Sequence, residues 1–136
     1  MTNSANAALV EYLGAEPHGC HPDLEQRLRE IGDGDPDPSF PIPVLVHPTG
    51  VAYAFAGGTF ILALRVPESL RAEVLEAPGT GRHQLVELHE WNLRFAERLG
   101  ADWVAVDPWP IDVKTEAGTE QLRAWARAAY EFAGSF

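Results

Sequence analysis

The chain has 136 residues, 46% of them hydrophobic, which gives room for a single hydrophobic core. Its formal net charge of −10 disfavours nucleic acid and anionic membranes as partners, because both repel an acidic surface. The sequence contains no run of about 18 apolar residues that could cross a membrane, and its N-terminus lacks the pattern of a signal peptide. The only cysteine, Cys20, has no partner for an internal disulfide, so we expect a cytoplasmic protein.

The first 31 residues predict a pair of helices. Apolar residues recur at helical spacing over residues 5–13, and Gly14 is expected to end this first helix. The second helix is expected over residues 22–31, with Pro22 at a favoured first position. Residues 32–43 hold four prolines and two glycines, so they predict an extended connector whose acidic residues face solvent. Since 31 residues are too few for a core of their own, we expect one domain over residues 1–136, with the sheet and further helices in residues 44–136.

Three strands are expected over residues 44–47, 51–56 and 59–66, as an antiparallel meander. The Gly57-Gly58 pair between the last two suits a two-residue hairpin turn, because both glycines tolerate positive φ. This turn would pair Phe55 with Phe60 and Tyr53 with Leu62. One sheet face would then carry the bulky residues of both strands and the other face mainly alanines.

The segment His47-Pro48-Thr49-Gly50 predicts a type I turn, because proline stands second and glycine fourth. If Gly50 also forms a glycine bulge, His47 lies beside Val51 on the bulky face; without the bulge it lies on the alanine face. The sequence leaves both arrangements open.

The C-terminal half predicts helices over residues 68–77, 84–99 and 116–133, with a strand over residues 102–107. Because the strands cluster before most of the helices, we expect an α+β fold, an antiparallel meander of three strands plus one later strand. Helices are expected mainly on one sheet face, which would leave the other face free for self-association.

Residues 57–133 resemble the MmcQ/YjbR-like family. The resemblance is carried by Gly57-Gly58-Thr59-Phe60, Arg65-Val66-Pro67-Glu68, Trp103-Val104-Ala105-Val106 and Ala129-Tyr130-Glu131-Phe132. It implies the family's fold, and for the family DNA binding through paired β-hairpin wings has been proposed. The chain departs from the family at Gly100-Ala101-Asp102, where the family is basic, so we carry over the fold and not the DNA binding.

Two segments hold residue types that bind ions. His18, Cys20 and His21 offer imidazole and thiolate ligands within four residues, but a structural zinc site needs a fourth ligand and no second cluster is present. We therefore expect no metal and no cofactor. The loop Gly79-Thr80-Gly81-Arg82 precedes a helix and could bind an anion through Arg82, although it lacks a phosphate-binding motif.

Residues near the end of the 102–107 strand supply the remaining candidates. Asp107 could orient His47 as a general base, and Trp109, between two prolines, could anchor a ligand. No nucleophile motif is present. The sequence therefore favours a non-catalytic interaction or regulatory module that forms a homodimer or binds a protein partner. The alternative is a small-molecule-binding or hydrolytic enzyme with a cleft near His47, Asp107 and Trp109.

Overall fold

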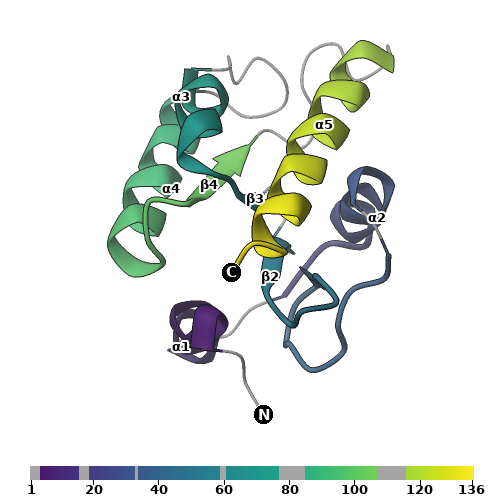
Figure 1. Cartoon of the computed structure of the whole chain (residues 1–136), viewed down its shortest axis with the longest axis vertical. Helices are drawn as coiled ribbons and strands as arrows, with labels where there is room; N and C mark the ends of the chain where they lie inside the picture. Colours follow the sequence, from purple (N-terminus) through teal and green to yellow (C-terminus); the bar gives the residue numbers. More distant parts are fainter. Residues whose placement is uncertain (1–3, 16–18, 33, 59–60, 77–84, 107–115) are drawn as a thin grey trace.

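A computed structural model of the chain describes residues 4–15, 19–32, 34–58, 61–76, 85–106 and 116–136. A four-stranded antiparallel sheet with the order β1-β2-β3-β4 forms its centre (Figure 1). Each strand pairs with the next one along the chain. The predicted α+β fold, a three-stranded meander joined by one later strand, is confirmed.

The elements follow the predicted order. The strands are β1 (Val44–Val46), β2 (Ala52–Gly57), β3 (Ile61–Arg65) and β4 (Trp103–Val106). A short 3₁₀ turn, η1 (Ser4–Asn6), leads into α1 (Ala7–Ala15), and the other helices are α2 (Pro22–Ile31), α3 (Glu68–Glu76), α4 (Leu85–Arg98) and α5 (Glu116–Ala133). The prediction that Gly14 ends the first helix is wrong, because α1 continues through it to Ala15. No helix in the described part of the chain is long and apolar enough to cross a membrane.

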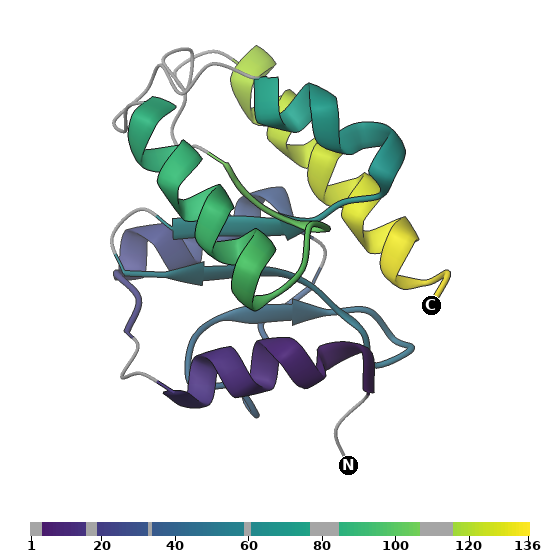
Figure 2. The same ribbon diagram turned by 90° about the vertical axis from the view of Figure 1, so that its left-hand side faces the viewer.

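Helices cover both faces of the sheet, so the expectation of helices mainly on one face is wrong (Figures 1 and 2). One face packs against α2, α3 and α5, through residues such as Leu28, Val74 and Ala129. The opposite face packs against α1 and α4, through residues such as Leu9 and Phe95. Every residue of β2, β3 and β4 is buried. The sheet therefore offers no free face for self-association.

The predicted register of the β2–β3 hairpin is wrong by three residues. Phe55 pairs with Ala63, not with Phe60, and Gly57 pairs with Ile61. The cause lies outside the hairpin: the N–H of Gly58 donates to the carbonyl of Gly19 at 2.7 Å, and the carbonyl of Gly58 accepts from the N–H of His21 at 2.8 Å. Gly58 has φ of +61° and bridges to the segment before α2, so it does not close a two-residue turn.

A bulge in β2 mixes large and small residues on both faces. The β1–β2 register shifts between Leu45 and Val46, which leaves Tyr53 as the extra residue. Tyr53 and the following Ala54 therefore both face α2 and α5, whereas Phe55 faces α1 and α4. The predicted division into a bulky face and an alanine face is wrong for this reason.

The turn after β1 forms as predicted. The N–H of Gly50 donates to the carbonyl of His47 at 2.7 Å, Gly50 has φ of +94°, and the N–H of His47 donates to the carbonyl of Val51 at 2.9 Å. This is the glycine-bulge arrangement. His47 lies on the face that packs against α5, together with Val51.

The N-terminal helix is fastened to the sheet by two buried polar side chains. Asn6, only 4% exposed, donates from Nδ2 to the carbonyl of Gly50 at 2.8 Å and accepts from the N–H of Ala52 through Oδ1 at 2.8 Å. Arg65, 8% exposed, donates to the carbonyl of Ala5 at 2.9 Å and to Oδ2 of Asp102 at 2.7 Å. These bonds fix the position of α1 along β2 and β3.

We predict that Asn6→Ala destabilises the protein by about 2–4 kcal/mol, because it leaves the buried N–H of Ala52 and the half-buried carbonyl of Gly50 without their side-chain partner. Urea denaturation followed by circular dichroism measures this difference. Ser4→Ala, an exposed position in the same turn, is the matched control and should change the free energy of unfolding by less than about 0.5 kcal/mol. An equally small effect of Asn6→Ala would contradict the role given to the amide.

Candidate functional site

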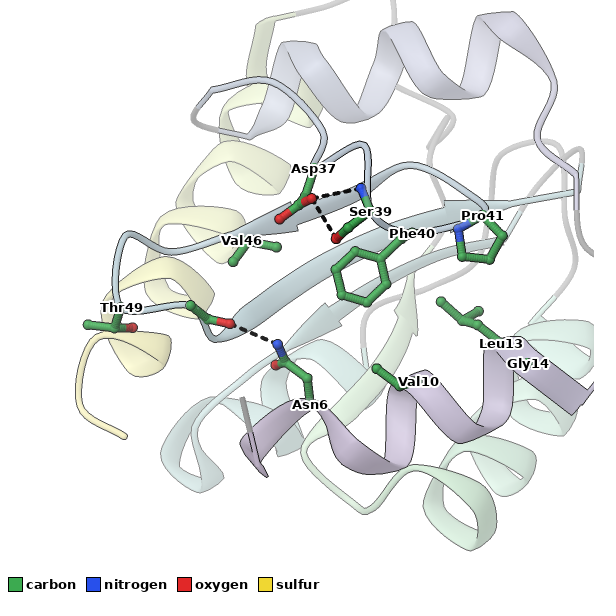
Figure 3. A pocket seen from close by; sticks show the side chains of 11 residues that line it. Asn6, Val10, Leu13, Gly14, Asp37, Ser39, Phe40, Pro41, Val46 and Thr49 are labelled. Carbon is green, nitrogen blue, oxygen red and sulfur yellow. Dashed lines mark hydrogen bonds between the residues drawn. The ribbon is translucent and has the colours of Figure 1, made fainter. Parts of the chain in front are cut away.

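A groove of about 640 Å³ lies between α1 and the connector that precedes β1 (Figure 3). One wall comes from η1 and α1, the other from residues 37–41, and β1 with the turn after it closes the groove between them. The lining residues are Asn6, Val10, Leu13, Gly14, Asp37, Ser39, Phe40, Pro41, Val46, Thr49 and Gly50. This volume lies within the range of sites that hold small molecules.

The α1 wall is apolar and open. Leu13 is buried against the sheet, while Val10 is 40% exposed and lies on the groove side of the helix (Figure 3). A Cβ atom added at Gly14 would meet nothing within 4 Å. A side chain introduced at Gly14 would therefore begin in open space at the groove.

The opposite wall is a tight turn that holds a carboxylate. Oδ1 of Asp37 accepts from the N–H of Ser39 at 2.9 Å and from its hydroxyl at 2.7 Å, and the N–H of Asp37 donates to the carbonyl of Val44 at 2.8 Å. The hydrogen bonds from Ser39, first from its backbone and then from its side chain, lower the pKa of Asp37 below its ordinary value. Asp37 is therefore a carboxylate at every physiological pH.

A smaller hollow of about 270 Å³ lies between the end of α2 and α5. Its two arginines are already paired. Arg123 donates to the carbonyl of Glu30 at 3.1 Å and to the carboxylate of Glu120 at 2.8 Å, and Arg127 donates to Glu131 at 3.3 Å. These contacts neutralise much of the charge that would attract an anion.

His47, the predicted general base, is held in place by its neighbours. Its Nδ1 accepts from the N–H of Thr49 at 3.0 Å and lies 2.9 Å from the Thr49 hydroxyl. Its ring packs against that of Tyr130 of α5, tilted by 51°, with 4.5 Å between the ring centroids. A Cβ added at Gly134 would lie 2.8 Å from Nε2, so the ring fits closely against the end of α5.

Asp107 and Trp109, predicted to share a cleft with His47, lie outside the described residues. Asp107 follows Val106 in the sequence. Val106, the last residue of β4, pairs with Leu62 of β3, and Leu62 pairs with Ala56 near the end of β2. His47 follows β1 at the other end of the sheet, beside Val51. Strand spacing and rise place His47 and Val106 roughly 20 Å apart, at diagonally opposite corners. Because Asp107 and Trp109 are not described, the cleft that they would share with His47 stays a prediction.

Cys20 and His21 have structural contacts. Nδ1 of His21 accepts from the N–H of Asp23 at 3.1 Å and caps the N-terminus of α2. Burial, with a smaller contribution from the charge of Glu25, raises the pKa of Cys20 to about 11. A thiol with this pKa is protonated at neutral pH, and a protonated thiol is a poor nucleophile and a poor metal ligand.

The other predicted site residues, His18 and Arg82, lie outside the described residues. Within the described part of the chain, no group of three or more His, Cys, Asp or Glu side chains is placed to hold a metal ion. The metal and anion hypotheses thus gain no support from the described residues.

The groove is a feature that the sequence did not predict. The pattern of residues 32–43 indicates a solvated acidic connector around Asp37, and no motif marks α1 as the wall of a site. A signal was present in Asp37-Pro38-Ser39, because aspartate followed two residues later by serine is typical of a turn in which the carboxylate binds the backbone. The contact between this turn and α1 depends on distant residues, so it could not be predicted from local spacing.

Comparison with protein-family models, curated proteins and solved structures gives no match for this chain. The resemblance to the MmcQ/YjbR-like family therefore stays a prediction. The functional argument depends on the geometry of the chain itself.

We predict that Cys20 reacts slowly with iodoacetamide. With a pKa of about 11 in place of 9.0, its thiolate fraction at pH 7.5 is about one hundredth of the ordinary value, and only the thiolate reacts. Mass spectrometry of the folded protein over time measures the rate. The same chain in urea is the control, since it contains no other cysteine. Equal rates in both states would show that the thiol is not shielded.

Proposed function

We propose that the protein is a non-catalytic binding module, and that the groove between α1 and residues 37–41 is its binding site. The observation that carries this proposal is the composition of the groove. Apolar side chains such as Val10, Phe40 and Val46 share it with one fixed carboxylate, that of Asp37. Apolar walls with a few oriented polar groups are typical of sites that hold small ligands.

A regulatory or carrier role fits the described residues better than catalysis. The thiol of Cys20 has a raised pKa, and a Cβ added at Gly134 would lie 2.8 Å from Nε2 of His47, so this nitrogen lies close against the end of α5 and away from the groove lining. Asp37 stands in the groove without a histidine or cysteine among the lining residues that the structure describes. An acid–base pair or an activated nucleophile would need such a neighbour.

Self-association and a protein partner remain part of the proposal, but the sheet faces are not the surface for them. Leu93 on α4 is 59% exposed and Leu75 on α3 is 47% exposed, and they are among the large apolar side chains that a second chain could cover. Sedimentation of the protein as a strict monomer at high concentration would remove this part of the proposal and leave the groove untouched.

The groove can be tested with a steric block. We predict that Gly14→Trp abolishes the binding of ligands found in a thermal-shift screen of metabolites, because the indole would fill open space at the groove. Ala8→Trp places the same side chain on an exposed position of α1 that does not line the groove, so ligands should still raise its melting temperature.

Ligands that stabilise Gly14→Trp as strongly as the unmodified protein would contradict the proposal. Both variants must first show the circular dichroism spectrum of the unmodified protein. Because the introduced Cβ at Gly14 meets nothing within 4 Å, we expect this variant to fold.

A further inference from the structure

We propose that the ligand of this groove is a small primary amine that carries an apolar chain, bound as its ammonium ion against Asp37. This inference deepens the proposed function and rests on the groove being a binding site. It names the ligand class from three properties of the lining: its charge, its hydrogen-bonding groups and its apolar wall.

Among the described residues that line the groove, Asp37 is the only ionisable one, and its charge is negative. None of these described lining residues is a cation that could neutralise it. Oδ1 of Asp37 accepts both bonds from Ser39, and Oδ2 has no partner among the described residues. The net charge of −10 adds attraction for cations at longer range and repels carboxylates and phosphates.

The hydrogen-bonding groups of the groove are mostly acceptors. The hydroxyl of Ser39 donates to Asp37, so its lone pairs remain for a ligand, beside the carboxylate. The backbone N–H groups of several lining residues already donate within the chain; these residues are Asp37, Ser39, Phe40, Thr49 and Gly50. Pro41 has no N–H. An anion would find few donors here, whereas an ammonium ion, with three donors and no acceptor, matches the free groups.

The apolar wall explains why the ligand should carry a hydrocarbon chain. Val10 is exposed on α1, and Phe40 and Val46 are half-buried across from it (Figure 3). The α1 wall from Asn6 to Gly14 extends about 12 Å at the helical rise of 1.5 Å per residue, which suits a chain of several carbons. A single exposed ion pair contributes little binding free energy. Each methylene group that the ligand buries against the apolar wall increases the affinity further.

The size of the groove favours a free small molecule over a lysine side chain of a protein partner. A volume of about 640 Å³ lies within the range of sites that enclose a free small ligand. The exposed residues around the groove include Pro41, Thr49 and Ser39, which offer no large apolar rim for an interface with a protein partner.

The test uses three probes of equal chain length: n-hexylamine, 1-hexanol and hexanoate. Each is titrated into the ¹⁵N-labelled protein at about 150 mM salt, which screens long-range attraction to the acidic surface. We expect hexylamine to shift the amide signals of Val10, Gly14 and Ser39, with an affinity about three- to tenfold above that of hexanol, as one charged hydrogen bond predicts. Hexanoate should bind more weakly than hexanol.

Two matched variants separate the groove carboxylate from the general charge. Asp37→Asn keeps an oxygen that accepts from Ser39 but removes the charge, so it should erase the preference for hexylamine over hexanol. Asp35→Asn removes the same charge from an exposed residue that pairs with Arg29 and does not line the groove, so the preference should remain. The dispersion of the amide spectrum shows whether each variant is folded.

Each remaining outcome overturns a defined part of the argument. If hexylamine and hexanol bind the groove equally, the amine inference is wrong while the binding module stands. If Asp35→Asn loses the preference as much as Asp37→Asn, the preference comes from net charge and the inference is again wrong.

If Nα-acetyl-lysine amide binds more tightly than hexylamine, the ligand is a lysine side chain and not a free amine. If no probe shifts the groove signals, the inference fails, and the Gly14→Trp screen decides whether the proposed function fails with it.

Discussion

The carboxamide of Asn6 holds the two parts of the groove together. This side chain donates to the carbonyl of Gly50 and accepts from the N–H of Ala52, so it pairs with the backbone at the start of β2 and joins the N-terminal helix to the sheet. The contact with Ala52 is buried, where an unpaired backbone group costs about 1–3 kcal/mol, and the contact with Gly50 is partly buried, so together they give α1 one defined position. The hydrogen bond from Arg65 to the carbonyl of Ala5 also holds the N-terminal helix against the sheet. Without these anchors, α1 would have only its apolar face to place it, and the wall of the groove would not be fixed.

Local signals were sufficient to predict the elements of this fold. Pro22 starts α2 where the sequence placed it, and the turn from His47 to Gly50 forms with the φ that only glycine adopts easily. These features depend on residues within a few positions of each other, so the sequence carries them directly. The order of the strands in the sheet could also be predicted from the sequence, because strands that are consecutive in the chain usually pair with each other.

The register depended on contacts that the local sequence does not contain. Gly58 pairs with the segment around Cys20, some forty residues earlier, and this contact replaces the tight turn that Gly57-Gly58 suggested. An odd shift of three residues exchanges the sheet faces of β3 relative to β2. The bulge at Tyr53 exchanges them once more within β2. Val51, Tyr53, Leu62 and Leu64 consequently share a face as predicted, while Phe55 lies on the other one. The unpredicted register shift and the unpredicted bulge therefore partly cancel in their effect on which side chains share a face. Neither can be detected from the alternation of apolar and polar residues alone.

Each edge strand of the sheet has a backbone group that is capped by another part of the described chain. At β4, the N–H of Ala105 donates to Oδ1 of Asn92 at 2.6 Å, and at β1 the carbonyl of Val44 accepts from Asp37. Capped edges cannot add a strand from another chain at these positions, which limits aggregation.

The residue that caps β1 is the same Asp37 whose side chain lines the groove. Its backbone protects the sheet edge, and its carboxylate is thereby held at a fixed place beside the edge. A charge held by the fold loses little conformational entropy when a ligand binds, so even a small ligand can gain from it. The turn at Asp37 and Ser39 therefore both caps the edge strand β1 and positions the carboxylate in the groove. A substitution that loosens this turn should disturb the edge and the groove together.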